Sequence, residues 1–215
     1  MFTDYKGIKL GQPIFYNNKF GLRFEIGPSD IDIYKGAATR GFNEAYFDTA
    51  LIRALSIFEE IFNEDDDVSI IYQVNLNRRN RIRKSNFIFK QIKDVEKREV
   101  VCTKYRSLDT AYYDCISYRM NKTVISGIKT KDINVKNIFV DLINTDFGTR
   151  NPLLKGRCLL VNHTRALVLD LYDDRGMDIV ALKKSTLNSL YETHLEFILD
   201  YDRKRIDEVY SKPKQ

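Results

Sequence analysis

The residues best suited to chemistry lie in one short segment that follows a predicted strand. It contains three carboxylates and one guanidinium, those of Asp173, Asp174, Asp178 and Arg175. Such a set could bind a metal ion or a phosphate group. The same residues also suit a turn, in which aspartates accept hydrogen bonds from backbone amides and Gly176 adopts a positive φ. Because no partner base or further ligand is adjacent in sequence, we expect the turn, with no catalytic or metal-ligating residues, and retain the four residues as a candidate binding site.

A strongly basic run offers a second candidate site. Its four arginines are Arg78, Arg79, Arg81 and Arg83. Arginines beside aromatic residues, here Phe87 and Phe89, are typical of loops that bind nucleic acid. Eleven basic and three acidic residues lie between positions 76 and 106, whereas the net charge of the whole chain is only +5. An acidic run over residues 59–67 precedes this segment and no known nucleic-acid-binding module accompanies it, so we expect the arginines to be solvated or paired internally.

The two histidines of the chain argue against a histidine-rich metal centre, and we expect no cofactor. His163 falls in a polar turn, where it should be exposed and could titrate near neutral pH. No nucleophile motif such as Gly-x-Ser-x-Gly surrounds it, so a catalytic role is not favoured. His194 falls on the apolar stripe of a predicted helix, and we expect it to be a hydrogen-bonded core residue.

The tripeptide Asp146-Phe147-Gly148 matches the magnesium-binding motif of protein kinases. A kinase also needs a glycine-rich phosphate loop, a strand lysine and a His-Arg-Asp loop, and the sequence has none of them. We therefore interpret the tripeptide as the end of a helix, with Phe147 packed inward and Gly148 in the left-handed conformation of a C-cap.

Apolar residues at helical spacing predict three helices, at residues 43–62, 133–145 and 187–198. The first is the longest, and Asn43 is its expected N-cap. The residues at the centre of its apolar stripe are expected in the core: Leu51, Leu55 and Phe58. The third pattern indicates that the chain nearly ends on another core helix.

Between the helices, apolar and polar residues alternate as in half-buried strands. The predicted strands span residues 22–26, 68–74, 100–105 and 114–119, and a hairpin joins residues 159–161 to 166–171. The hairpin favours an antiparallel sheet. We therefore predict an α+β fold, in which a largely antiparallel sheet packs against a few amphipathic helices, as a single domain over residues 1–210 with a frayed tail at 211–215.

Composition sets the class of protein. A chain of 215 residues with 43% hydrophobic content can bury a core without disulfides. Its cysteines, Cys102, Cys115 and Cys158, are odd in number and far apart, so we expect them reduced and buried. No basic segment with an apolar run begins the chain, and no long apolar stretch occurs within it. These features predict a cytoplasmic location and no association with membranes.

The most specific string in the sequence is Tyr172-Asp173-Asp174-Arg175-Gly176, within residues 169–178. This string and several weaker stretches resemble an uncharacterised domain family found mostly in bacilli and their relatives. Weaker landmarks follow at 190–191 and 199–203 and precede it at 22–25, 43–47 and 146–148. The resemblance covers most of the chain and implies identity rather than an activity, a cofactor or functional residues.

We expect a non-enzymatic cytoplasmic domain that binds another protein, with toxin neutralisation of the immunity type as its most concrete form. A rigid surface with segregated charge suits such a partner. Two alternatives remain. One is nucleic-acid binding through residues 78–84, and the other is an enzyme of unknown reaction that uses Asp173, Asp174 and Asp178.

Overall fold

A seven-stranded sheet forms the centre of the molecule, and every pair of neighbouring strands in it is antiparallel. The computed structural model describes residues 4–36, 41–75, 87–108, 117–152, 154 and 156–211. The strand order is β3-β9-β8-β7-β4-β6-β5. The strands are β3 (Phe20–Glu25), β4 (Asp67–Asn75), β5 (Glu99–Leu108), β6 (Ser117–Lys129), β7 (Arg157–Asn162), β8 (Leu167–Leu171) and β9 (Gly176–Ala181). A separate two-stranded sheet pairs β1 (Asp4–Tyr5) with β2 (Ile8–Lys9). The predicted α+β class and antiparallel sheet are confirmed.

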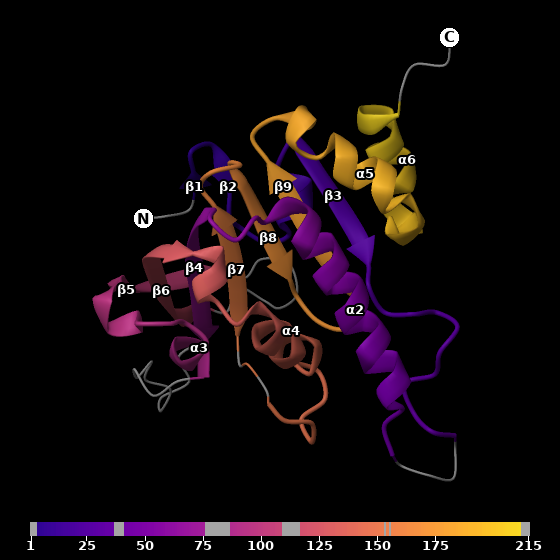
Figure 1. The fold of residues 1–215 in the computed structure, drawn as a ribbon, viewed down its shortest axis with the longest axis horizontal. Helices are drawn as coiled ribbons and strands as arrows, with labels where there is room; N and C mark the ends of the chain where they lie inside the picture. Colours follow the sequence, from indigo (N-terminus) through magenta and orange to yellow (C-terminus); the bar gives the residue numbers. More distant parts are fainter. Residues whose placement is uncertain are drawn as a thin grey trace.

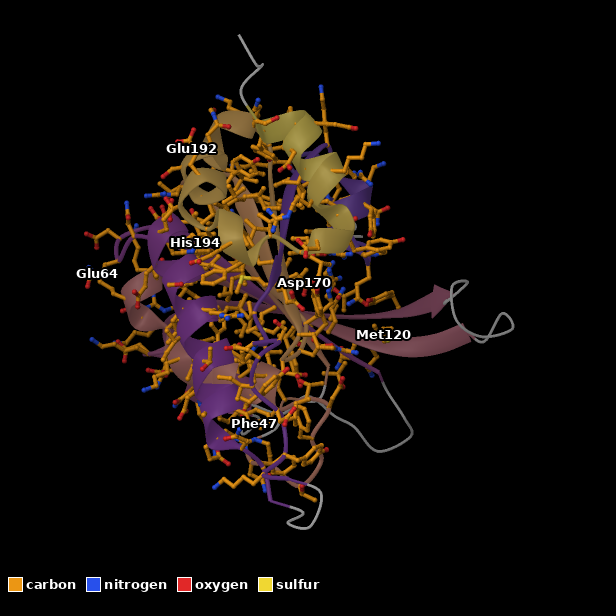
Figure 2. The ribbon with its side chains drawn as sticks, turned by 90° about the vertical axis from the view of Figure 1, so that its right-hand side faces the viewer. Phe47, Glu64, Met120, Asp170, Glu192 and His194 are labelled. Carbon is orange, nitrogen blue, oxygen red and sulfur yellow. The ribbon has the colours of Figure 1, made fainter. Side chains whose placement is uncertain are left out.

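Six α-helices accompany the strands in the described residues. They are α1 (Ile14–Asn17), α2 (Glu44–Ile61), α3 (Phe87–Lys90), α4 (Val135–Ile143), α5 (Asn188–Thr193) and α6 (Asp200–Tyr210). Figure 1 shows α2 crossing one face of the sheet, with α5 and α6 beside β3 and β9. In Figure 2, β5 and β6 project from the rest of the sheet as a two-stranded arm. No helix among the described residues is long and apolar enough to cross a membrane.

The sheet separates two apolar clusters because successive residues of a strand point to opposite faces. In β9, Met177 and Ile179 join the larger cluster, which contains the buried residues of α2, α4 and α5. Val180 points the other way, into a smaller cluster with Tyr5 and Ile14 of the N-terminal segment. The segment from Tyr5 to Ile14 therefore covers part of the second face.

Helix α2 has the predicted extent, and its buried stripe is the predicted one shifted toward Ile57 and Ile61. Phe58 is buried as predicted, whereas Leu51 and Leu55 are only half-buried, so the prediction was wrong for these two residues. The fully buried residues recur at i, i+4, i+7 and i+11, and they are Ala50, Ala54, Ile57 and Ile61. Leu51 and Leu55 lie beside this stripe and pack against the same cluster while partly exposed. Asn43 precedes the helix as expected, but its side chain accepts no hydrogen bond from the first turn, and its Nδ2 donates to the Asp32 carbonyl at 3.0 Å.

The C-terminal prediction of one helix over residues 187–198 was wrong. Helix α5 ends at Thr193, a 3₁₀ turn follows at Leu195–Phe197, and Ile198 pairs with Phe24 at the edge of β3. Leu195 is 43% exposed and so does not belong to a buried stripe. His194 is buried as predicted, with its Nε2 3.0 Å from a Glu60 carboxylate oxygen. The chain then forms the unpredicted helix α6.

Smaller differences concern helix ends and thiols. Helix α4 lies within the predicted range, and Phe147 packs against Phe47 with ring centres 5.0 Å apart. Gly148 does not have the predicted left-handed conformation, because its φ is not positive. Cys158 is buried as predicted, but Cys102 is exposed on the edge strand β5. Cys115, residues 114–116 of a predicted strand and residues 212–215 of the predicted tail lie outside the described residues.

Candidate binding site

The turn between β8 and β9 is held by its own side chains. The Asp173 carboxylate accepts hydrogen bonds from the Arg175 backbone amide at 2.8 Å and from Arg175 Nε at 3.0 Å, and Arg175 Nη2 binds the same carboxylate. These contacts are the turn chemistry that the sequence predicts. Hydrogen bonding to Asp173 raises the pKa of the Arg175 guanidinium, which therefore stays charged.

Asp174 faces helix α2 instead of solvent. The Tyr46 hydroxyl donates to Asp174 Oδ2 at 2.7 Å, and both residues are buried. Burial raises the pKa of the Asp174 carboxyl, and the hydrogen bond from Tyr46 opposes that rise. Gly27 leaves room for this pair, since a Cβ there would lie 2.6 Å from the Tyr46 hydroxyl oxygen. The Ile26 amide also donates to the Arg175 carbonyl at 3.0 Å, so the turn, α2 and the segment after β3 form one unit.

Gly176 is required for a different reason from the predicted one. Its φ is not positive, and it is the first residue of β9. A Cβ at this position would overlap the Tyr172 ring, with Cζ at 2.6 Å, and would lie 3.1 Å from the Phe24 carbonyl oxygen. Close approach of Tyr172, and not backbone conformation, therefore excludes a side chain at Gly176.

Asp178 does not join Asp173 and Asp174. It lies in β9 with its side chain on the opposite face of the sheet, where Arg23 Nε donates to Oδ1 at 2.8 Å and Arg23 Nη2 to Oδ2 at 3.1 Å. Burial raises the pKa of Asp178, and the bonds from Arg23 counteract this. Asp170 is directly opposite Asp178 in the sheet and is paired with Arg157 at 2.6 Å. The three aspartates of the enzyme alternative are thus held apart, and each has an internal partner.

Arg175 lines the cavity beside the turn. Its side chain is 70% exposed, and Nη2 lies 3.2 Å from an oxygen of Asp146. The cavity has a volume of about 920 Å³ and is bounded mainly by the segment between β3 and α2. Its lining residues are Glu25, Gly27, Pro28, Ser29, Ile31, Asp32, Ile33, Tyr34, Gly36, Tyr46 and Arg175. Pockets that enclose ligands commonly have volumes of about 300–1,000 Å³.

Sequence reasoning missed most of this cavity. Only Arg175 was a candidate, although Tyr46 falls in the landmark at residues 43–47. The pair Gly27-Pro28 directly after a strand is a signal for a loop, and it could have directed attention to the segment that forms the wall.

A second polar cluster surrounds His163, which was predicted to be exposed and is half-buried. Its Nε2 lies 2.7 Å from the Ser69 hydroxyl oxygen and its Nδ1 lies 2.8 Å from the Tyr5 hydroxyl oxygen. Burial, followed by the nearby charge of Lys6, lowers the pKa of the imidazole. The cluster ties β1 to the central strand β4.

The structure does not test the other group of candidates. Arg78, Arg79, Arg81 and Arg83 lie outside the described residues. Within residues 4–36, 41–75, 87–108, 117–152, 154 and 156–211, no group of three or more histidine, cysteine, aspartate or glutamate side chains could hold a metal ion.

Comparisons with known proteins place the chain among uncharacterised relatives. The family described as "Domain of unknown function (DUF3885)" matches residues 1–202. The "Uncharacterized protein YnaE" of Bacillus subtilis (strain 168) is 23% identical over 198 residues, covering 88% of this chain and 91% of the relative. No solved structure matches the chain. Because the family match spans nearly the whole sequence, including the turn and the cavity wall, the chain belongs to the DUF3885 family.

Proposed function

We propose that this chain acts by binding another protein and not by catalysing a reaction, and that the partner docks over the cavity beside Arg175. One observation carries the proposal. The carboxylates of Asp173 and Asp174 are engaged in internal hydrogen bonds, and Arg175, which is paired with Asp173 and Asp146, still exposes most of its side chain at a cavity. Arginine and tyrosine are enriched among the residues that dominate protein interfaces.

Tyr34 supports the same face as the docking surface. Its side chain is 51% exposed and stacks on Phe42, with ring centres 5.5 Å apart and an angle of 26° between the planes. Phe42 in turn contacts Phe47 and Phe147 edge to face. The exposed ring is therefore held by a rigid aromatic cluster, which reduces the entropy lost when a partner covers it.

Toxin neutralisation is the most concrete form of this function. An immunity-type protein must present a preformed surface and needs no reaction centre, which suits a cavity built on a sheet and a long helix. In this form the partner is toxic when produced alone, and co-production of this chain restores growth.

Site-specific photo-crosslinking tests the docking face. A photoreactive phenylalanine analogue is placed at Tyr34 or, as a control, at Tyr201, which is 86% exposed and does not line the cavity. Crosslinking in the native cells should capture one protein from position 34 and not from 201. That protein, once purified, should bind the wild type and lose affinity for Arg175→Ala, whose melting temperature must first be shown to match. Capture only from position 201, or unchanged binding by Arg175→Ala, would contradict the proposal.

No described residue favours the alternatives. The nucleic-acid hypothesis depends on residues 78–84, outside the described part of the chain, and it predicts a raised ratio of absorbance at 260 and 280 nm in the purified protein. The enzyme hypothesis requires Asp173, Asp174 and Asp178 to act together, but Asp178 lies on the other face of the sheet.

A further inference from the structure

The cavity beside Arg175 has two carboxylates without internal partners. Glu25, at the end of β3, and Asp32, in the segment before α2, line it and are both exposed. Within the described residues, neither carboxylate accepts a hydrogen bond or forms an ion pair, unlike Asp173, Asp174 and Asp178. Their charges are therefore available to a ligand.

The positive charge of the cavity is already compensated. Among the described lining residues, Arg175 is the one cation, and two carboxylates lie against it, those of Asp173 and Asp146. Both are held on the guanidinium by charge-assisted hydrogen bonds. With Arg175 neutralised in this way, the carboxylates of Glu25 and Asp32 are the lining charges that have no internal partner among the described residues.

The rest of the lining is apolar or aromatic. Pro28, Ile31, Ile33 and the exposed Tyr34 are among the lining residues. An aromatic ring face attracts a cation that lies within about 6 Å of its centre. A cation on an apolar stem therefore suits this cavity better than an anion or a purely apolar group.

We infer that the cavity receives a lysine or arginine side chain of the partner protein, flanked by apolar residues. This inference rests on the proposed function, and it adds the chemistry of the partner. The aliphatic stem of such a side chain packs on Ile31 and Ile33, and its charged end lies between the carboxylates of Glu25 and Asp32.

A titration with short peptides tests the inference without the natural partner. The probes are acetyl-Leu-Arg-Leu-amide and acetyl-Leu-Glu-Leu-amide, added to isotope-labelled protein while backbone amide signals are followed by NMR. The arginine peptide should produce saturable shifts in residues 25–36 and at Arg175, and the glutamate peptide should not. The shifts should weaken as salt is added, because exposed charges are screened.

Matched variants compare two kinds of carboxylate at the end of β3 and in the segment that follows it, those that line the cavity and one that does not. Glu25→Gln combined with Asp32→Asn should weaken binding of the arginine peptide by about two- to tenfold. Asp30→Asn, which removes an exposed charge in the same segment but outside the lining, should leave it unchanged. Saturable shifts elsewhere, no saturable shifts with the arginine peptide, or equal binding of the two peptides would overturn the inference.

The natural partner distinguishes failure of the inference from failure of the proposed function. A partner could crosslink at position 34 but bind the Glu25→Gln, Asp32→Asn variant as tightly as the wild type. That result would support the proposed docking face and contradict the inference that a basic side chain enters the cavity. If the partner crosslinks only at position 201, the docking face itself is wrong.

Discussion

Single residues in this molecule show how differently a fold can compensate buried charge. Asp170 and Asp178 each have an arginine, and Asp174 has a tyrosine hydroxyl. Asp141 of α4 is fully buried, yet among the described residues neither of its carboxylate oxygens has a hydrogen-bond partner. Burial alone raises the pKa of this carboxyl to about 7. An uncompensated carboxyl is stable in the core only in its neutral form.

Asp141 should therefore make stability depend on pH. Its folded-state pKa is raised above that of the unfolded chain, so the folded state holds the proton more tightly. The resulting stabilisation is present at about pH 4 and is lost as the pH rises to about 7. Asp141→Asn removes this dependence and should be more stable than the wild type at pH 8 by up to about 4 kcal/mol, with a smaller difference at pH 5. Urea denaturation at both pH values measures the difference.

A control for Asp141 is Asp48→Asn, which removes an exposed carboxylate of α2. It should not change the shape of the profile of stability against pH. If Asp141→Asn changed the stability equally at pH 5 and pH 8, burial would not raise the pKa of the Asp141 carboxyl, and the prediction would be wrong.

Gly176 should be intolerant of a side chain because of Tyr172. Gly176→Ala places a methyl group against the Tyr172 ring and should cost about 1–3 kcal/mol of unfolding free energy. Tyr172→Phe removes the hydroxyl that the methyl group meets first, so the cost should be smaller in that background. Gly148→Ala is the control, since no atom lies within 4 Å of a Cβ there. An equal cost in both backgrounds, measured by denaturation, would exclude close approach as the cause.

At the scale of elements, the spacing of apolar residues predicts whether a segment is a helix or a strand. It predicts less accurately which side chains of that segment are buried. Residues 43–62 were recognised because seven apolar positions share one face. That count cannot separate Leu55 from Ile57, because both lie close to the stripe. The separation depends on where the sheet approaches the helix, which a local pattern does not contain.

The revised stripe makes a prediction about α2. Ile57→Ala should cost about 2–5 kcal/mol, since Ile57 is completely buried. Leu55→Ala should cost clearly less, because part of its side chain is already in water. Denaturation of the two variants under identical conditions gives the comparison. A larger loss for Leu55→Ala would restore the stripe expected from sequence.

In the candidate site, the sequence predicts contacts only between residues that lie close together in the chain. Asp173 and Arg175 are two residues apart, so their hydrogen bonds could be anticipated from turn chemistry. Tyr46 and Asp174 are separated by 128 residues, and no pattern in a single sequence links them. The strand β9 was missed for a related reason, because its first residues resemble a polar turn until β3 and β8 pair with them.

At the scale of the whole molecule, two arginines fasten the N-terminal segment to the sheet. Arg157 binds Asp170 and donates to the Leu10 carbonyl at 2.7 Å. Arg23 binds Asp178, which also accepts from the Phe15 amide at 3.4 Å. These contacts hold residues 10–15 over the smaller apolar cluster.

Removing one partner of such a pair should cost more than removing both. Arg157→Leu leaves the Asp170 carboxylate buried and unpaired, at an expected cost of about 3–5 kcal/mol. Arg157→Leu with Asp170→Leu should recover a large part of that loss. Hydrogen exchange should show faster exchange near Leu10 in the single variant. Additive losses in the double variant would mean that the two residues do not act as a pair.

The position of the N-terminal segment also has a consequence for synthesis on the ribosome. Phe15 and Asp178 are 163 residues apart, and among the described strands β9 is the neighbour of β3 in the sheet. At about 5–20 residues per second, roughly 10 to 30 s pass between the synthesis of β3 and that of β9. During that interval the nascent chain carries an unpaired strand and an incomplete apolar cluster. We expect chains that end before residue 176 to be captured by chaperones or degraded, since the fold closes only when its last strand arrives.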